Sequence, residues 1–324
     1  MLFKVLNELK NSEDYMSGET LSKKFNVTRS AVWKAISSLR NKGYNINSIK
    51  NKGYKLIESP DIISSYEINE KLTADGYKNN IYIYKTIDST NKAAKINADN
   101  NASDKSVFIS EIQTDGKGRI DRKWISESEK GLYFSILLKP KLKIADISKI
   151  TLIAAVAVCH TLRESYGLDI FIKWPNDIVI NGKKICGILT EMSMQSDFIN
   201  YIVIGIGINL NNKIINSEIE NRATSLFLES NILHTRSSIF AEIINNFDDY
   251  YEKYFINNTD GFTDAFNSYC INIGKTVVAS YKNKEITGTA LGINNKGELI
   301  VKTDNEEVFI SSGEVSLRGK DSYV

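Results

Sequence analysis

FIKWPNDIVINGKKICGIL, residues 171–189, sets a group of polar and charged side chains between two apolar runs. One of the three prolines in the chain stands between Trp174 and Asn176, where it forces an extended or turned backbone. A surface hairpin would not need the tryptophan, and a buried strand would avoid the charges. The stretch therefore predicts a strand hairpin that carries a functional site.

The side chains of this hairpin suit a phosphorylated ligand. Lys173 is a point charge that suits phosphate, and Asp177, with Asn176, suits a Mg²⁺ ion that substrate phosphates also hold. Lys184 follows a few residues on. Glycines in this strand and in the later apolar strand YIVIGIGINL weaken both strands unless something packs there. We interpret three of them as a pocket floor: Gly187, Gly205 and Gly207.

A second unusual stretch, DGKGRIDRKWISESEK (residues 115–130), combines glycine with positive charge. Gly116 and Gly118 let backbone amides approach an anion. Its first basic side chains are Lys117, Arg119, Arg122 and Lys123. A Walker A motif would need GK[ST] at the start of a helix, which is absent here. The alternative is a flexible charged loop without a ligand, but Trp124 favours a loop that covers something.

The first sixty residues differ in charge from the rest of the chain. Between Thr20 and Ile57 there are nine Lys or Arg and no Asp or Glu, and residues 1–60 carry a net charge of +6 against −4 for the remainder. This imbalance indicates a polyanionic partner for the N-terminal part alone.

The pattern of this segment predicts a winged helix-turn-helix. Leu21 and Phe25 share a face of a first helix, Asn26-Val27 makes the turn, and apolar residues of 28–42 recur at helical spacing. The segment 44–58 alternates around a turn at Asn51, as in a two-stranded wing. The residues expected to contact DNA are Thr28, Arg29, Ser30, Trp33, Lys34, Lys50 and Lys52. The alternative is a small helical module for protein contacts.

The fold class that these patterns predict is α+β and multidomain. Residues 1–62 form the winged helix-turn-helix, 63–271 a mixed α/β-sheet domain that includes a buried helix over 149–167, and 272–324 an SH3-like β-barrel. The barrel is expected to act as a structural cap on the central sheet, in preference to an independent binding role.

Composition excludes several classes of protein. Three scattered cysteines form no CxxC pair, and two histidines give little material for a zinc site or a Ser-His-Asp triad. No apolar run reaches the length of a membrane span, and the N-terminus lacks the features of a signal peptide. We therefore expect a cytoplasmic protein that does not contact a membrane.

The order of five motifs resembles that in biotin protein ligases. The motifs are DSTN (88–91), QTDGKGRIDRKW (113–124), KWPND (173–177), KKICGIL (183–189) and GIGINL (205–210), and GEVSLRGK (313–320) follows. With the helix-turn-helix before them, the chain resembles the bifunctional branch, in which one chain is both biotin ligase and biotin-operon repressor. The resemblance covers essentially the whole chain.

The resemblance implies a two-step reaction and a set of partners. Biotin and ATP, with Mg²⁺, give biotinoyl-5'-AMP, and a lysine of a biotin carboxyl carrier protein then takes the biotin. Biotinoyl-AMP is the co-repressor, operator DNA is the second partner, and the adenylate-bound chain is a homodimer. Neither step needs a covalent enzyme intermediate.

The resemblance also assigns roles to residues of this sequence. Catalytic residues would be Lys184, Arg119, Lys173 and Asp177, with Asp177 at Mg²⁺ through the phosphates. Biotin would contact Ser89, Thr90, Asn91, Gln113, Gly116, Lys117, Gly118, Arg119, Lys184, Gly187, Leu189, Gly205 and Gly207. ATP would contact Arg119, Arg122, Trp124, Lys173, Asn176, Asn209 and Arg318. Ser89-Thr90-Asn91 is also expected to cap a helix.

Two positions depart from the family pattern. Many relatives have Arg in place of Lys117, which would weaken a bidentate phosphate contact, and Ala223 stands where some relatives place an aromatic ring over adenine. Two alternatives remain at this point. A lipoate ligase shares the central fold but carries a different glycine-rich motif and no winged helix, and a ligand-sensing repressor without catalysis need not keep the phosphate-handling residues.

Overall fold

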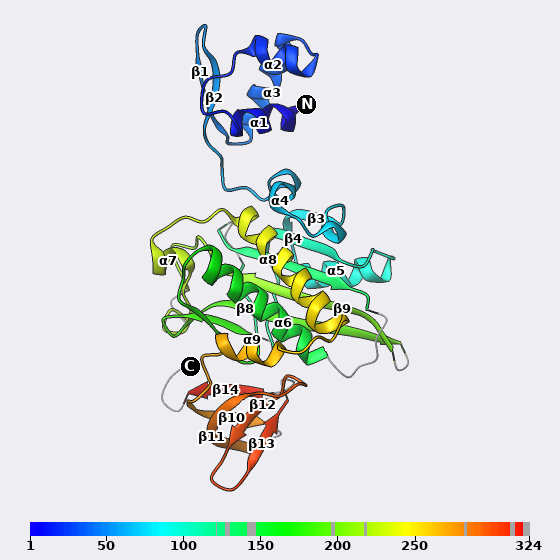
Figure 1. Cartoon of the computed structure of the whole chain (residues 1–324), viewed down its shortest axis with the longest axis vertical. Helices are drawn as coiled ribbons and strands as arrows, with labels where there is room; N and C mark the ends of the chain where they lie inside the picture. Colours follow the sequence, from blue (N-terminus) through cyan, green and yellow to red (C-terminus); the bar gives the residue numbers. More distant parts are fainter. Residues whose placement is uncertain are drawn as a thin grey trace. The chain divides into compact units, whose positions relative to one another are not determined.

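The computed structural model describes residues 1–120, 122–126, 130–140, 147–195, 198–216, 219–281, 284–311 and 315–319. Within them the chain forms two compact units, Met1–Ile62 and Ile63–Val324 (Figure 1). The first predicted domain spans the same residues as the first unit, and the predicted limit at residue 271 falls inside the second.

The N-terminal unit confirms the helix-turn-helix. Its helices are α1 (Leu2–Lys10), α2 (Gly18–Phe25) and α3 (Arg29–Asn41). Asn26 adopts the left-handed conformation that ends α2, and the Thr28 hydroxyl accepts a hydrogen bond from Ala31 N at the start of α3. The predicted inner face of α3 is buried; it consists of Val32, Ala35, Ile36 and Leu39.

The wing is an antiparallel pair, β1 (Asn45–Ile49) and β2 (Gly53–Glu58). Met16 and Tyr54 exchange backbone hydrogen bonds of 2.8 and 2.9 Å, which fasten the wing to the segment before α2. Gly53 is required at its position, because its φ is +116° and a Cβ there would lie 2.1 Å from Met16 O.

The larger unit is built on a mixed seven-stranded sheet of order β3-β4-β5-β9-β8-β7-β6, in which only the β3–β4 pair is parallel. The strands are β3 (Ile81–Ile87), β4 (Ser106–Gln113), β5 (Leu132–Leu138), β6 (Ile170–Lys173), β7 (Asp177–Ile180), β8 (Lys183–Gln195) and β9 (Phe198–Ile208). Strands β6 to β8 are the hairpins expected from residues 171–189.

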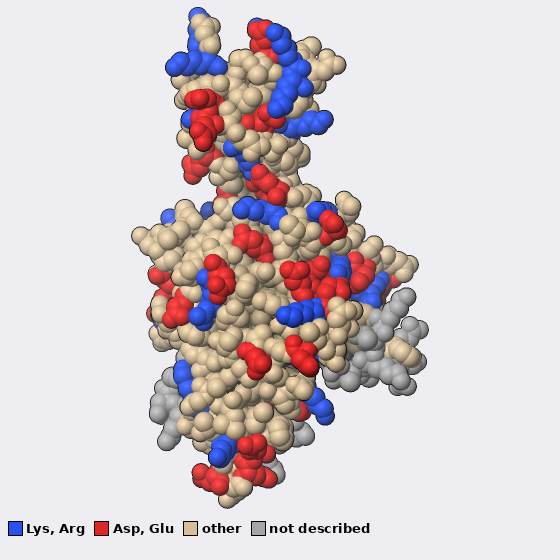
Figure 2. Space-filling model, in the orientation of Figure 1, with Lys and Arg blue, Asp and Glu red and all other residues tan. Residues whose placement is uncertain are grey.

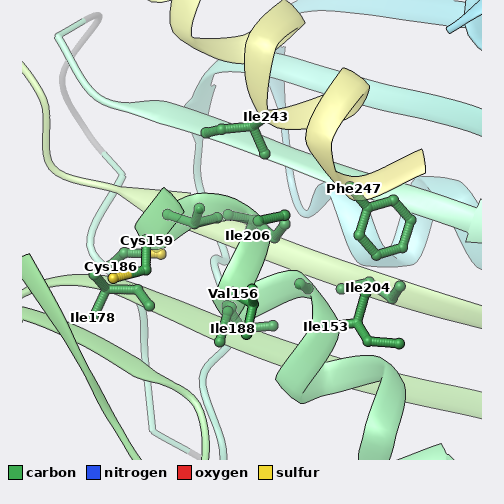
Figure 3. Close-up of a cluster of buried hydrophobic side chains, with 14 of the residues drawn as sticks. Ile153, Val156, Cys159, Ile178, Cys186, Ile188, Ile204, Ile206, Ile243 and Phe247 are labelled. Atoms are coloured by element: carbon green, nitrogen blue, oxygen red, sulfur yellow. The ribbon is translucent and has the colours of Figure 1, made fainter. Parts of the chain in front are cut away.

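Helices cover both faces of this sheet. On one face α6 (Ile147–His160) and α8 (Arg236–Tyr250) enclose the main core with β7, β8 and β9 (Figure 3). Residues Leu152 to Cys159 of α6 are fully buried, which confirms the predicted buried helix. On the other face α5 (Thr90–Asp99) packs through its alanines against Phe108, Leu137 and Val203. The remaining helices are α4 (Ser65–Lys71), α7 (Leu226–Ser230) and α9 (Phe262–Tyr269).

The C-terminal strands form a separate five-stranded antiparallel sheet of order β13-β12-β11-β10-β14, as predicted for an SH3-like barrel. They are β10 (Thr276–Tyr281), β11 (Lys284–Ile293), β12 (Leu299–Lys302), β13 (Glu307–Ile310) and β14 (Val315–Gly319). None of the helices in the described ranges is long and apolar enough to cross a membrane.

Trp174 joins the two sheets, which explains a tryptophan among the charges of residues 171–189. Its indole Nε1 donates to Gly297 O, in the turn between β11 and β12 of the C-terminal sheet, at 3.3 Å, and its backbone N donates to Asn272 Oδ1, just before β10, at 2.9 Å. The side chain is 1% exposed. It therefore holds the KWPND segment against the C-terminal sheet.

Replacing Trp174 with phenylalanine is expected to lower the free energy of unfolding by about 1–3 kcal/mol, because Gly297 O loses its indole donor in a dry site. Urea unfolding checks this. Trp33, which is 58% exposed, provides the control: Trp33→Phe should leave the unfolding midpoint unchanged. Equal midpoints for the two variants would contradict the joining role of Trp174.

Candidate functional site

Fourteen of the predicted site residues line one pocket between the start of α5, the 115–126 segment and strands β7 to β9. Its lining consists of Ser89, Thr90, Asn91, Gln113, Lys117, Gly118, Arg119, Trp124, Asn176, Lys184, Gly187, Ile188, Leu189, Gly205, Ile206 and Gly207. Sequence reasoning missed Ile188 and Ile206. Ile206 stands between Gly205 and Gly207, and Ile188 follows Gly187; both side chains belong to the buried core, so their apolar character indicated core positions and not a pocket lining.

The start of α5 is capped differently from the prediction. Ser89 of the expected Ser89-Thr90-Asn91 segment occupies the N-cap position, but its side chain makes no capping hydrogen bond. Gln113 Oε1 instead accepts from Thr90 N at 2.8 Å and from Thr90 Oγ1 at 3.1 Å. A glutamine on β4 thus satisfies one of the free N–H groups of the helix and leaves the Ser89 hydroxyl at the pocket.

Two serines that the sequence analysis did not select extend this network. The Ser135 hydroxyl on β5 lies 2.8 Å from Thr90 Oγ1 and 2.6 Å from Asn91 Oδ1, and its one hydrogen is shared between these two acceptors. Ser126 accepts from Gln113 Nε2 at 3.0 Å. Both serines are almost fully buried. The network fixes the orientation of polar groups behind the pocket wall.

The glycines of β8 and β9 line the pocket and also make room for its own side chains. A Cβ at Gly205 would lie 2.1 Å from Asn91 Oδ1, and one at Gly207 would lie 2.5 Å from Trp124 Nε1. Trp124 therefore lies flat on β9. This accounts for a strand that stays intact with two glycines in it.

Lys184 stands at the centre of the charged side of the pocket. Its Nζ lies 2.6 Å from Asp177 Oδ1 and 5.4 Å from the centre of the Trp124 ring. Its backbone N donates to Arg222 O, and its carbonyl accepts from Thr224 N. Ala223, one of the two positions that depart from the family pattern, therefore lies next to Lys184, with which it forms an isolated β-bridge.

A second cation, Arg119, is held by the KWPND segment. Its guanidinium donates to Asn176 Oδ1 at 2.7 Å, while Asn176 Nδ2 donates to Ile188 O at 2.9 Å. Burial lowers the pKa of Arg119 from its ordinary value, and the charge of Asp177 acts in the opposite direction. An arginine keeps its charge at neutral pH, so two cations face the same pocket.

The 115–126 segment is folded back on itself where it is described. Trp124 N donates to Gly116 O at 2.8 Å, and Gly118 N donates to Arg122 O at 2.6 Å. Lys117 and Arg122 are exposed, and only Lys117 lines the pocket. Residues 121 and 127–129 of the predicted loop lie outside the described residues.

Six predicted residues do not line the pocket: Gly116, Arg122, Lys173, Asp177, Asn209 and Arg318. Lys173 is buried and lies opposite Asp177 in the β6–β7 register. The Asn209 amide donates to Thr224 O at 3.0 Å, which fastens the segment beside Lys184. The backbone of Arg318 pairs with Val278, but its side chain lies outside the described residues.

Asp177 is engaged by Lys184, so a metal ion would have to compete with that ion pair. In the parts of the chain that the structure describes, no three His, Cys, Asp or Glu side chains are placed to hold a metal ion. The side chains present therefore do not form a complete protein site for Mg²⁺. A role of Asp177 at Mg²⁺ stays a prediction.

In the N-terminal unit the predicted DNA-contacting residues lie on α3 and the wing. Trp33, Lys34, Lys50 and Lys52 are exposed, and basic side chains are visible on this unit in Figure 2. Arg29 forms an exposed ion pair with Glu19 of α2, which also pairs with Lys23. DNA phosphates would have to replace the Glu19 carboxylate at Arg29.

Comparison with known proteins decides the family. The chain is 35% identical to the bifunctional ligase/repressor BirA of Bacillus subtilis over 94% of each chain. It belongs to the bifunctional biotin ligase and repressor family. Residues 83–209 match the biotin/lipoate A/B protein ligase family, 2–55 an HTH domain and 273–318 the biotin protein ligase C-terminal domain.

More distant members of the biotin ligase family agree. BirA of Escherichia coli is 27% identical over 98% of this chain and 97% of its own. The biotin protein ligase from Aquifex aeolicus in complex with biotin and ATP has a TM-score of 0.65 and 30% identity, covering 74% of this chain and 99% of that one.

Proposed function

We propose that the pocket of residues 89–91, 113–124 and 173–207 activates biotin with ATP and then transfers biotin to a lysine of a biotin carboxyl carrier protein. The chain is a biotin protein ligase with a repressor function, as its family membership and helix-turn-helix support. The observation that carries the assignment of this pocket is its division into a neutral polar end and a cationic end.

The neutral end suits the ureido ring of biotin. Ser89, Thr90 and Gln113 offer hydroxyl and amide groups that can both donate and accept, which a neutral cyclic urea requires. Gly187, Leu189 and Gly205, which carry no polar side-chain groups, continue the pocket lining from there along β8 and β9.

The cationic end suits the carboxylate of biotin and the α-phosphate of ATP. Two anions must approach each other when the carboxylate oxygen attacks phosphorus and pyrophosphate leaves. Lys184 and Arg119 lower that repulsion by lying in one partly buried pocket. Trp124, Lys117 and the segment at Asn209 would surround the nucleotide.

The second step needs no nucleophile from this chain. The neutral carrier lysine attacks the carbonyl carbon of biotinoyl-AMP, the bond from that carbon to the phosphate oxygen breaks, AMP leaves with the electron pair, and the amine nitrogen loses a proton to water. Cys186 lies next to Gly187, but burial raises the pKa of its thiol far above the ordinary value, so it does not supply a thiolate. Mg²⁺ would enter on the phosphates of ATP and offset part of their charge, and Asp177 is the carboxylate proposed to contact it.

For the second activity we propose that biotinoyl-AMP is the co-repressor and that the adenylate-bound chain binds its operator as a homodimer in the cytoplasm. In the described residues, β8 beyond Ile188 pairs only with β9. This unpaired edge offers backbone groups to a second copy. Two winged helices on one dimer would contact two half-sites.

Biotin-dependent release of pyrophosphate from ATP tests the enzymatic proposal. Biotin should support release, and lipoate should not. Release with lipoate alone would favour the lipoate ligase alternative, and no release with either acid would favour a sensor without catalysis.

We expect biotin with ATP to slow protease cleavage after Lys117, Arg119 and Arg122 and to increase the sedimenting mass. The glycines and charges of the 115–130 loop make its ordering costly without an anion, which the adenylate would supply. The Lys184→Ala chain, which should form the adenylate about 10³-fold more slowly, is the control at short incubation times. Unchanged cleavage and mass in the wild-type chain would contradict this coupling.

A further inference from the structure

We infer that Glu191, outside the pocket, is a positioning residue that fixes the orientation of the Asn91 amide and, through it, the donors and acceptors offered to biotin. The inference rests on the proposed function of the pocket. Glu191 lies on β8, two residues beyond Leu189, and is absent from the pocket lining.

Helix α5 brings two side chains to this carboxylate. Asn91 and Lys95 are one turn apart and therefore share a helix face. Asn91 Nδ2 lies 2.7 Å from Glu191 Oε2, and Lys95 Nζ lies 2.5 Å from Glu191 Oε1. An ionised carboxylate only accepts hydrogen bonds, so the nitrogen of the Asn91 amide must face it.

The oxygen of the same amide is consequently turned toward the centre of the network. Asn91 Oδ1 accepts from Ser135 Oγ at 2.6 Å and occupies the space left by the missing side chain of Gly205. The Asn91 side chain is almost fully buried. Both ends of the amide thus have a partner of the matching kind in only one orientation.

The direction of the hydrogen bonds is fixed from the opposite end as well. Thr90 N can only donate, so the oxygen of the Gln113 amide faces α5 and its nitrogen faces Ser126. The Thr90 hydroxyl donates to Gln113 Oε1 and therefore accepts from Ser135. Ser135 lies between these two acceptors, Thr90 Oγ1 and Asn91 Oδ1, and they share its single hydroxyl hydrogen.

Removing the charge of Glu191 would release one end of this hydrogen-bond network. A glutamine at 191 can donate as well as accept, so the Asn91 amide could turn over and present its nitrogen to Ser135. The Ser135 hydroxyl would then accept from Asn91 Nδ2 and give its hydrogen to Thr90 Oγ1 alone, and the Asn91 oxygen would face residue 191. No atom of the pocket lining is deleted, yet its hydrogen-bonding pattern changes.

The test is biotin-dependent pyrophosphate release by the full chain. Glu191→Gln should raise KM for biotin about tenfold, the effect of roughly one hydrogen bond, with kcat and KM for ATP within about twofold of wild type. Asp99→Asn, an exposed carboxylate at the end of α5, is the matched control and should change nothing.

A double-mutant cycle separates positioning from general damage. Asn91→Ala alone should raise KM for biotin, and adding Glu191→Gln to it should have no further effect. A further tenfold rise in the double variant, or an unchanged KM in Glu191→Gln, would overturn the inference. If Glu191→Gln does not fold, Glu191→Met, which also lacks the charge, is expected to raise KM in the same way, and an unchanged KM there would overturn it.

If the pocket does not activate biotin, the experiments give a different result from the one that overturns the role of Glu191. In that case the wild-type chain itself releases no pyrophosphate with biotin. The inference about Glu191 is overturned only when the wild-type chain is active and the variants match it.

Discussion

Replacing Lys184 with alanine is expected to lower the rate of biotin-dependent pyrophosphate release by about 10³-fold, as is usual when one preorganised charge is removed from an active site. Lys184 contacts Asp177, Trp124 and the backbone of the 222–224 segment, so its charge is held in place before substrates bind. Without it the carboxylate and the α-phosphate approach beside an unneutralised Asp177. The measurement is pyrophosphate release at saturating biotin and ATP.

Lys183→Ala is the matched control for this variant. Lys183 is the adjacent residue of β8, carries the same charge and points to the opposite face of the strand. It should keep nearly all of the activity. A Lys184→Ala chain that releases pyrophosphate at a near-normal rate would remove Lys184 from the mechanism.

A chain that begins at Ile63 is expected to lose all specific operator binding and to keep adenylate formation. The pocket lining lies entirely in the unit Ile63–Val324, and the helix-turn-helix lies entirely in Met1–Ile62. The basic excess lies in the smaller unit, and phosphate neutralisation supplies most of the affinity for DNA. The two readouts are operator binding by gel shift and pyrophosphate release.

A full-length Lys34→Ala chain provides the control for truncation. Lys34 is exposed on α3 beside Trp33, so its loss should weaken operator binding. The slope of log binding constant against log salt concentration should fall by about one, the value for one phosphate contact. Pyrophosphate release should stay unchanged. Operator binding by the truncated chain would contradict the account. A truncated chain without adenylate formation would show that the units are coupled.

The sequence predicted the elements whose patterns are local. Helix α3 follows from Val32, Ile36 and Leu39 at helical spacing, and the wing follows from alternation around Asn51. The KWPND hairpin was expected because a proline and charges between apolar runs exclude an ordinary strand. The resemblance to biotin ligases then predicted 14 of the residues that line the pocket.

Contacts between residues far apart in the chain were not predictable in this way. Ser135 is 45 residues from Thr90, and Glu191 is 100 residues from Asn91, so no local pattern joins them. Ser89 was expected to cap α5, but a glutamine from β4 takes that place because the sheet brings it there. The ion pair of Asp177 with Lys184 across the β7–β8 hairpin, where a bulge shifts the register, was not predicted either, and the role of Asp177 at Mg²⁺ stays a prediction.

The most direct test of the central claim is the intact mass of a biotin carboxyl carrier domain after incubation with this chain, ATP, Mg²⁺ and biotin. We expect the domain to gain the mass of one biotinoyl group at its acceptor lysine, lipoate to give no gain, and the Lys184→Ala chain to give the gain with biotin about 10³-fold more slowly. A carrier domain of unchanged mass with the wild-type chain, or an equal gain with lipoate, would contradict it.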